Sequence, residues 1–571
     1  SLIGVFPGMD ISCLRPEAFV TDNPLLKETA VKLKKSAESI KKSNKNQITF
    51  YDYHADDEEN EYYQMIASQT GEEDSADEVS QTRQHYETLR NNNLLRMKAY
   101  RYNYFTTSFY SLPFLTNHTD PEKYIRLSAF SNFDIFSKEE DLCDEAINHF
   151  ALEQRFFHWE LEFPEIFDEK ISQNPGFDCV LGNPPWERIK LQEKEFFDTL
   201  DPEIATAKNK NAREKLIQSL PERHPDLYRM FSNAKSKSVC DSSFLRNADR
   251  FPLTAKGDIN TYPLFAEHFF KLINQQGRTG IIVPTGIATD DSTKDFFGYL
   301  TQNQHIVSLN DFENKLKIFA DVHSSFKFTL LSLSKKPVPE ATFSFFMHQM
   351  DELNDPIRTF TLTKEDLQRI NPNTGTTPIF RTQYDAELTK KIYQKVPVLC
   401  RETEDDVLQL DKYSPNPWGI SFQRMFDMSN DSHLFQNEPA ENRLALYEAK
   451  MIWHYDHRFG SYANVAEDSV DTHLPTPELS DYQNPAYSIT PRYWVDQLEV
   501  YKRLAALSKE EKEKLELISY EEQILWLKPR VPGYLFGFRD ISNNTNERSF
   551  IGSILPLSGV GNNLPVISVK K

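Results

Sequence analysis

The four consecutive residues Asn183, Pro184, Pro185 and Trp186 combine groups that could hold an amino group on a planar ring. The two prolines fix the φ angles of the chain and remove two N–H donors, so the loop presents mainly carbonyl acceptors. The Asn183 side chain adds another acceptor, and Trp186 adds a flat stacking surface. Two acceptors that hold the hydrogens of an exocyclic amino group could favour a pyramidal nitrogen whose lone pair points at an electrophilic methyl group. These residues therefore predict methyl transfer by positioning and hydrogen bonding, with no metal ion.

The segments around this loop predict an α/β fold. Residues 177–181 have the pattern of a short buried strand, which runs directly into Gly182 and the loop. Farther along we expect a helix at 262–274 and a turn between the glycines at 277 and 280. Three further strands are expected at 281–283, 306–312 and 326–333. Repeated helix and strand argue for a mainly parallel sheet, and ligands of such sheets lie at the carboxyl ends of the strands. The loop at 183–186 would lie at one of these ends.

The rest of the chain differs on either side of this region. Residues 23–43 and 81–112 have helical patterns, and an acidic stretch at 54–80 interrupts them. Residues 190–240 are polar and mostly helical in pattern. After about residue 350, prolines, glycines and aromatic residues are scattered through irregular segments, which predicts a loop-rich α+β domain with short strands. We therefore expect a helical and acidic insertion region, a catalytic half and a second domain, at 1–150, 151–350 and 351–571.

The composition limits the classes of partner and compartment. The 571-residue chain has a formal net charge of −20, so any surface that attracts nucleic acid must be local. The five cysteines are far apart and form no CxxC pair, which argues against a zinc ribbon and a disulfide framework. No window approaches 18 consecutive apolar residues, and no basic region precedes the apolar N-terminus. A reducing cytoplasm fits these features best.

Residues 178–186 resemble the catalytic motif of amino-methyltransferases, in which Asp, Asn or Ser is followed by two prolines and an aromatic residue. The flanking sequence narrows the resemblance to the large adenine-specific methylases of type IIG restriction–modification and BREX-like phage-defence systems. The segments that carry it are 156–164, 280–289, 321–328, 416–419, 426–431 and 537–541. The resemblance covers most of the chain from about residue 150 onward.

This resemblance implies part of a class I methyltransferase sheet with helical insertions, followed by a target-recognition domain for double-stranded DNA. Asn183 and the Pro184 carbonyl would bind the adenine amino group, and Trp186 would stack on the base. Phe326 or Phe328 would pack on its other face, although the two alternate along a strand and one of them is expected to be plain core. The base would leave the duplex because its amino group is out of reach there. The methyl donor of the family is S-adenosylmethionine.

The glycine-rich turn that binds this donor in the family is missing from the sequence. It is typically Asp-Pro-x-x-Gly-x-Gly, and no such run precedes Asn183. The glycines at positions 4 and 8 have the wrong spacing. In the family a segment resembling residues 1–4 closely follows the donor motifs, so we expect the chain to begin partway through the methyltransferase fold. A second subunit or an N-terminal segment would then carry the donor site. No convincing nuclease motif is present.

Two other interpretations stay open. The same motif serves methylation of glutamine side chains in proteins and of adenine in RNA, but the long domain after residue 350 favours duplex DNA. A catalytically silent DNA-binding or assembly subunit would explain the missing donor turn, whereas the intact loop at 183–186 argues against it.

Further candidate residues lie in the second half. We expect it to read the DNA sequence, with five arginines among aromatic residues: Arg381, Arg424, Arg458, Arg492 and Arg539. At least half of them are expected to form internal salt bridges in so acidic a chain. Three tryptophans fit a core or a domain interface better than base contact: Trp418, Trp453 and Trp494. His454, Asp456 and His457 are metal-ligand types, but no further ligand group is evident in the sequence, and surface or structural roles are favoured.

Overall fold

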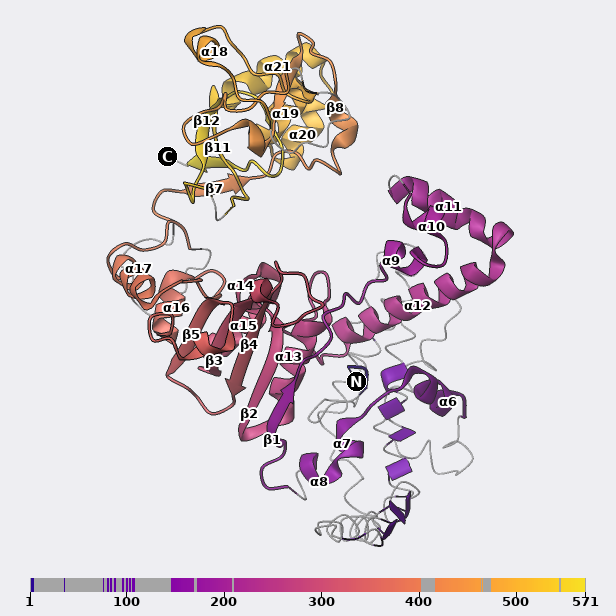
Figure 1. Cartoon of the computed structure of the whole chain (residues 1–571). Coiled ribbons are helices and arrows are strands. Elements are labelled where there is room, and N and C mark those ends of the chain that lie inside the picture. Colours follow the sequence, from indigo (N-terminus) through magenta and orange to yellow (C-terminus); the bar gives the residue numbers. More distant parts are fainter. Residues whose placement is uncertain are drawn as a thin grey trace. The chain divides into compact units, whose positions relative to one another are not determined.

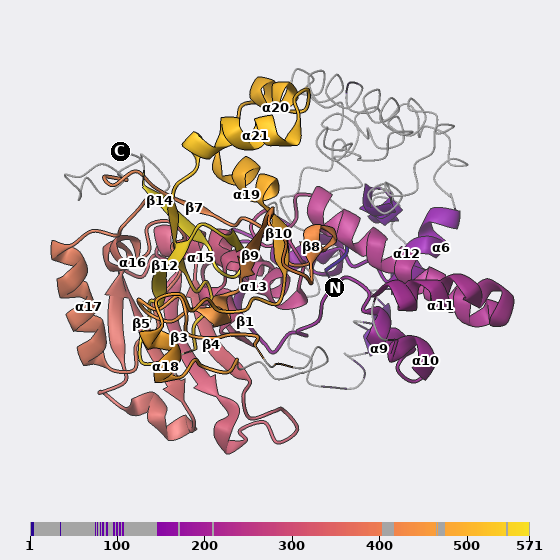
Figure 2. The same ribbon diagram turned by 90° about the horizontal axis from the view of Figure 1, so that it is seen from above.

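The structure is a computed structural model of the chain, shown in Figures 1 and 2. It describes residues 145–168, 172–207, 210–401, 416–463, 474–543 and 546–569, together with residues 2–4, residue 465 and single residues between 35 and 107. The helices expected at 23–43 and 81–112 and the acidic stretch at 54–80 lie largely outside the described residues, as does most of the region expected at 1–150. The chain divides into two compact units, Ser1–Val398 and Leu399–Lys571.

A six-stranded sheet forms the centre of the first unit as described (Figure 1). Its strands are β1 (Phe177–Gly182), β2 (Ile273–Pro284), β3 (Ile306–Glu313), β4 (Lys327–Ser334), β5 (Glu340–Met347) and β6 (Phe360–Thr363), in the order β1-β2-β4-β3-β5-β6. β1, β2, β3 and β5 run in one direction, and β4 and β6 run in the other. The sheet is therefore mixed rather than mainly parallel, because β4 returns antiparallel between β2 and β3.

The boundaries of the expected strands agree with the structure except in β2, and β5 and β6 were not predicted from the sequence. β3 and β4 begin and end within one residue of the expected strands. β2 begins at Ile273, inside the expected helix, and continues through Gly277 and Gly280 rather than turning between them. Glycine suits this strand because the backbone of β1 is close: a Cβ on Gly277 would lie 2.7 Å from the Phe177 carbonyl oxygen.

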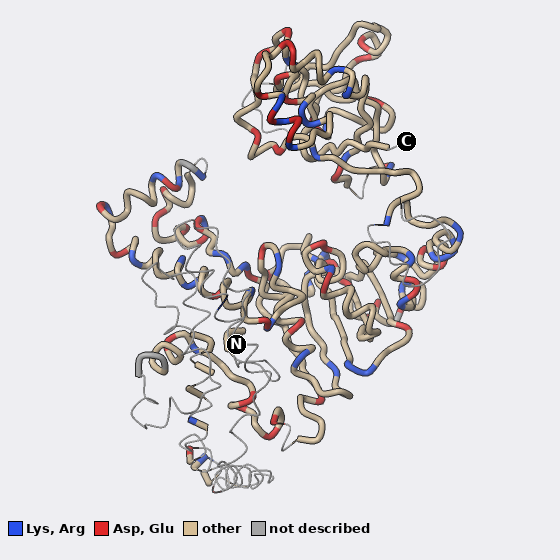
Figure 3. Tube along the Cα trace, turned by 180° about the vertical axis from the view of Figure 1, so that it is seen from behind, with Lys and Arg blue, Asp and Glu red and all other residues tan. Residues whose placement is uncertain are grey.

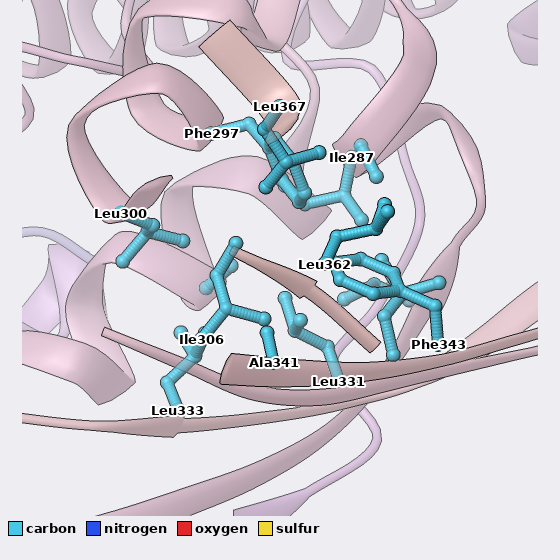
Figure 4. Close-up of a cluster of buried hydrophobic side chains, with 14 of the residues drawn as sticks. Ile287, Phe297, Leu300, Ile306, Leu331, Leu333, Ala341, Phe343, Leu362 and Leu367 are labelled. Carbon is cyan, nitrogen blue, oxygen red and sulfur yellow. The ribbon is translucent and has the colours of Figure 1, made fainter. Parts of the chain in front are cut away.

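The main core of the first unit lies between the sheet and a layer of helices. These helices are α13 (Thr261–Leu272), α14 (Gly286–Thr289), α15 (Lys294–Gln302), α16 (Lys364–Ile370) and α17 (Gln383–Lys395). Figure 4 shows Phe297 and Leu300 of α15 and Leu367 of α16 against Leu331 and Phe343 of the sheet. Each of these side chains is buried, and such burial contributes about 1.5–3 kcal/mol per side chain.

A helical arm leaves the sheet between β1 and α13. It contains α9 (Glu193–Phe197), α10 (Pro202–Ala205), α11 (Lys210–Arg223) and α12 (Pro225–Asn247). Both views show α11 and the adjoining end of α12 projecting away from the sheet (Figures 1 and 2). The arm has a small core of its own around Phe197, Leu220 and Phe231. The helical pattern expected at 190–240 is thus confirmed. Before β1 lie α6 (Glu145–Gln154), α7 (Trp159–Glu162) and α8 (Pro164–Phe167).

The second unit combines short strands with helices, as expected for a loop-rich α+β domain. Its described strands form two four-stranded sheets, β13-β9-β10-β8 and β12-β11-β14-β7. The strands are β7 (Ile420–Gln423), β8 (Phe435–Gln436), β9 (Arg443–Tyr447), β10 (Trp494–Asp496), β11 (Tyr534–Phe538), β12 (Gly552–Pro556), β13 (Gly559–Val560) and β14 (Val566–Val569). The helices are α18 (Leu479–Gln483), α19 (Gln497–Leu504), α20 (Lys509–Leu515) and α21 (Tyr520–Leu527).

The two units separate after Val398, about fifty residues beyond the change of sequence texture at residue 350. The reason is that β6, α16 and α17 belong to the first unit, where Phe360, Leu362 and Ala386 are part of the main core. Short 3₁₀ helices lie at Asp291–Thr293, Asn314–Leu316, Met350–Asn354, Ser432–Leu434, Ala449–Met451 and Lys528–Arg530. In the part of the chain that the structure describes, no helix has both the length and the apolar character to cross a membrane.

Candidate active site

The loop Asn183–Trp186 lies at the carboxyl end of β1, beside the carboxyl end of β2. Asn183 and Pro185 are exposed, Trp186 is half-buried and Pro184 is buried. The Asn183 side chain has no hydrogen-bond partner among the described residues, so its amide is free to meet a ligand. Gly182 brings the loop against α13, because a Cβ there would lie only 2.8 Å from the Phe269 ring.

Thr261, the first residue of α13, fixes the backbone on both sides of Trp186. Its hydroxyl donates to the Pro185 carbonyl at 2.6 Å and accepts from the Glu187 N–H at 2.8 Å. Its own N–H donates to the Glu187 carbonyl at 2.8 Å. Sequence analysis missed this residue; the available signal was the Asn260-Thr261 pair at the start of a strongly amphipathic helix, where Asn260 is the N-cap. We call these three hydrogen bonds the Thr261 clamp.

The sheet holds the Trp186 side chain through one hydrogen bond and one packed side of the ring. Its indole Nε1–H donates to the Ile282 carbonyl at 3.3 Å. The ring packs against the cluster that contains the buried residues Phe312, Phe328 and Met347. The indole is thus fixed at its nitrogen and on the side that packs against this cluster. Only its remaining surface can contact a ligand, and its orientation is set before any ligand binds.

The two phenylalanines expected to face the substrate differ in burial. Phe328, in β4, is 3% exposed; it stacks on Phe312 with ring centroids 5.3 Å apart and meets the edge of Phe319. Phe326, just before β4, is 53% exposed. Alternation does not separate the two rings, because residues two apart in a strand share a face. Phe328 is buried within β4, whereas Phe326 precedes the strand and is exposed, so Phe326 is the one that can contact a ligand.

Charged groups gather at the same end of the sheet. The Glu313 carboxylate, at the end of β3, accepts from Lys327 at 3.1 Å and is also paired with Lys315 and His348. Burial alone would raise the pKa of Glu313, but hydrogen bonds from Lys315, Lys327 and His348 outweigh it and lower the pKa to about 2. Glu313 therefore stays ionised and holds two lysines near Phe326.

A buried aspartate and a bulge lie next to this group. Asp311 in β3 accepts hydrogen bonds from the Thr285 hydroxyl and, at 3.2 Å, from the Phe346 N–H. Burial raises the pKa of this carboxyl. Phe346 has a φ of 60° and stands in a β-bulge of β5 opposite Asp311. Bulges of this kind redirect side chains and are frequent next to active sites.

The arginines expected to read DNA are mostly held by aromatic rings. Arg424 pairs with Asp540 at 2.9 Å. The other four lie over rings at 4.8–5.3 Å from the centroid: Arg381 over Phe346, Arg458 over Tyr482, Arg492 over Tyr493 and Arg539 over Trp453. Among the described residues only Arg424 of these five forms a salt bridge, fewer than the half or more expected, and Arg539 also donates two hydrogen bonds to the Ile452 carbonyl, at 2.6 and 3.1 Å.

The tryptophans and the histidine-rich segment of the second unit also have defined places. Trp453 stacks on Phe459 under Arg539, and Trp494 is half-buried in β10. Trp418 is exposed, which excludes the core among the two positions expected for it, the core and a domain interface. Asp456 accepts from the Tyr482 hydroxyl at 2.8 Å and its carbonyl accepts from the Trp453 N–H at 2.7 Å, which is a structural turn. Among the described residues, no group of three or more His, Cys, Asp or Glu side chains could hold a metal ion.

Comparison with solved structures finds restriction–modification enzymes. The type IIG restriction endonuclease BpuSI is 13% identical, with a TM-score of 0.22, over 69% of this chain and 42% of that chain. The type IIL enzyme MmeI, solved with DNA, is 11% identical with a TM-score of 0.29, over 73% of this chain and 44% of that chain. A type I methyltransferase subunit from Streptococcus thermophilus is 10% identical with a TM-score of 0.21, over 61% of this chain and 99% of that chain. This chain thus matches less than half the length of the first two.

No curated protein matches the chain. Its sequence matches the family described as Eco57I restriction-modification methylase over residues 26–245 and 233–319, which together span just over half of the chain. The matched region includes the loop Asn183–Trp186 and the Thr261 clamp and ends before Phe326. The chain belongs to the Eco57I restriction-modification methylase family.

Proposed function

We propose that this chain carries the base-positioning part of a site-specific DNA adenine N6-methyltransferase of a bacterial restriction–modification or phage-defence system. The observation that carries the proposal is the free Asn183 amide on a loop locked by the Thr261 clamp at the end of a strand. Family membership supports methyl transfer in a restriction–modification system. The adenine substrate rests on the type and order of the four loop residues.

The clamp determines which acceptors of the loop remain for a substrate. The Pro185 carbonyl already accepts from Thr261, which leaves the Asn183 side-chain oxygen and the Pro184 carbonyl. In the proposed complex each accepts one hydrogen of the adenine amino group, and this favours a pyramidal nitrogen with its lone pair exposed. The work of the chain is positioning, which can contribute several kcal/mol to lowering a barrier.

The two faces of the base are assigned to aromatic rings. Trp186 is already held by the Ile282 carbonyl and the cluster below it, so it can receive a flat base without reorganising. Phe326 is exposed near the same end of the sheet and would cover the other face. An adenine extruded from the duplex loses stacking, and two aromatic contacts compensate for that loss.

The methyl group would come from S-adenosylmethionine, which supplies an electrophilic carbon when bound. No run of the type Asp-Pro-x-x-Gly-x-Gly, which binds this donor in the family, precedes Asn183. Among the described residues β1 pairs with β2 alone. Leu181 of β1 is 76% exposed although the sequence has the pattern of a buried strand. Because an exposed apolar edge strand invites pairing, we infer that a second subunit or an N-terminal segment with the donor turn covers this edge.

The test is to identify the methyl acceptor. The native assembly is incubated with S-adenosylmethionine carrying a labelled methyl group, together with duplex DNA, RNA or a glutamine-containing protein. Digestion and mass spectrometry should find the label as N6-methyladenine in duplex DNA. Label in glutamine or RNA would establish one of the alternative substrates. DNA binding by an assembly that transfers no methyl group to any acceptor would establish a silent subunit.

A further inference from the structure

The segment 187–191, which connects the Trp186 loop to the helical arm, is fixed along its backbone. The Thr261 clamp holds both backbone groups of Glu187. The Ile189 N–H donates to the Ile259 carbonyl at 3.1 Å, and the Ile189 carbonyl accepts from the Ser238 hydroxyl at 2.7 Å. The same hydroxyl accepts from the Leu191 N–H at 3.0 Å. Residues of both α12 and the start of α13 therefore set its conformation.

Its side chains separate into two groups. Ile189 packs against the cluster around Phe244 and Phe251, and Leu191 packs against the core of the arm. Arg188 and Lys190 are exposed. The two anchored apolar residues thus alternate with two cations that face solvent.

These cations are free of carboxylates. Among the described residues, neither Arg188 nor Lys190 forms an ion pair. Of the nearby acids in sequence, Glu187 is exposed and forms no ion pair among the described residues, and Glu193 is engaged by Arg213 at 2.9 Å. This is informative in a chain with a net charge of −20, in which acidic and basic residues intermingle along each unit (Figure 3). Two exposed, unpaired cations on a fixed stretch of backbone in an acidic protein are suited to an anionic ligand.

We propose that Arg188 and Lys190 bind phosphates of the DNA backbone next to the base held by Asn183 and Trp186. Arg188 is two residues from Trp186, so its Cα lies within about 7 Å of that of Trp186. Phosphate contacts position a protein on the duplex without reading its sequence, and here they would set the register at which one base reaches the loop. This proposal rests on the proposed DNA substrate and adds the site that holds its backbone.

The salt dependence of DNA binding tests the proposal. The native assembly and its Arg188→Ala/Lys190→Ala variant are titrated with duplex DNA over a range of salt concentrations. Each lost phosphate contact lowers the slope of log K against log salt by about 0.9, so the variant slope should be smaller by about 1.8. The same relation predicts roughly thirtyfold weaker binding near 0.15 M salt.

Controls separate this site from general charge and from folding. Lys210→Ala removes a cation that is 78% exposed on α11 and pairs with Glu214, and it should leave the slope unchanged. Arg188→Lys keeps the charge and should retain the wild-type slope. An unchanged slope in the double variant, at wild-type thermal stability, overturns the phosphate site alone. An assembly in which even the wild type fails to bind duplex DNA contradicts the proposed function as well.

Discussion

At the scale of single residues, consecutive side chains in the loop have separate tasks. Asn183 is exposed and unpaired within the described chain, Pro185 gives its carbonyl to Thr261, and Trp186 is fixed by the sheet. The four candidate residues could be selected from the sequence because they are neighbours in one motif, but the contacts with Thr261 and Ile282 that hold the loop could not. The sequence could not show which of Phe326 and Phe328 is exposed. Burial of Phe328 depends on how β4 packs against Phe312 and Phe319.

The difference between Phe326 and Phe328 gives a first prediction. Phe328→Ala should lower the free energy of unfolding by about 3–5 kcal/mol, because it leaves a cavity in the core. Phe326→Ala should leave stability within about 0.5 kcal/mol of wild type, because the side chain is exposed, and should weaken methyl transfer instead. Denaturant unfolding and initial rates measure the two effects. A large loss of stability in the Phe326 variant would place that ring in the core.

At the scale of elements, α13 is the part that makes the loop rigid. Its first residue, Thr261, reaches the carbonyl of Pro185, 76 positions earlier in the chain. The helix itself was predictable from its apolar face, but its contact with the loop was not. A hydrogen bond between such distant segments leaves no periodic signal in the sequence.

Breaking the Thr261 clamp should affect turnover more than binding. Thr261→Val keeps the shape but leaves the Pro185 carbonyl and the Glu187 N–H without the Thr261 hydroxyl, and each of these part-buried hydrogen bonds contributes about 0.5–1.5 kcal/mol. We expect kcat to fall about tenfold or more, since small displacements of a positioned group are costly, while KM for DNA stays near wild type. Thr261→Ser retains the hydroxyl and should recover most of kcat. Equal kcat in the Val variant and wild type would mean that the loop needs no clamp.

Element prediction from sequence succeeded where side-chain periodicity is strong. β3 and β4 match to within one residue, since their apolar runs end at clear polar boundaries. The strand predicted at 281–283 is shorter than β2, because Asn274–Arg278 is polar and contains a glycine, which suggests a turn. In the structure this stretch is held by pairing with β1 and by the Asn274 side chain, which donates to Asp178 at 2.6 Å. Strand direction also depends on long-range pairing, which explains the unexpected antiparallel β4.

At the scale of the whole molecule, buried histidines make stability depend on pH. His158 is buried and bonded to Asn103 at 2.9 Å. Burial, and then the neighbouring Arg250 charge, lower its pKa to about 3. The unfolded chain binds a proton there near pH 6.5 and the folded chain does not, so stability falls as pH drops below about 6.5 and continues to fall toward 3.

His158→Gln should reduce that acid sensitivity. Between pH 7.5 and 5.5 one such histidine removes about 1.4 kcal/mol of folding free energy. The variant should therefore lose about 1.4 kcal/mol less than wild type over this interval, as measured by denaturant unfolding at the two pH values. The same loss in both proteins would show that His158 is protonated in the folded state.

The absent glycine-rich turn leads to a prediction about the isolated chain. Without the donor turn it should bind S-adenosylmethionine weakly or not at all, whereas the complete assembly should bind it. Isothermal titration calorimetry on each distinguishes these cases. Micromolar affinity for the isolated chain would reveal a donor site within these residues.

We propose that the second unit reads the DNA sequence. Replacing residues 399–571 by the corresponding unit of a related methylase should transfer the recognised DNA site, because sequence is read by side chains that reach base edges. Sequencing of methylated positions reports the outcome. An unchanged site in an active chimera would place recognition in the first unit.

The most direct measurement of the central claim is methyl transfer by an Asn183→Ala variant of the complete assembly. The substitution removes the exposed amide and leaves the Thr261 clamp in place, so the variant should fold normally and bind DNA with near wild-type affinity. Transfer to adenine, followed as labelled N6-methyladenine in single-turnover reactions, should fall below detection. Near-normal transfer by this variant, with the donor bound, would contradict the assignment of Asn183 as the residue that positions the amino group.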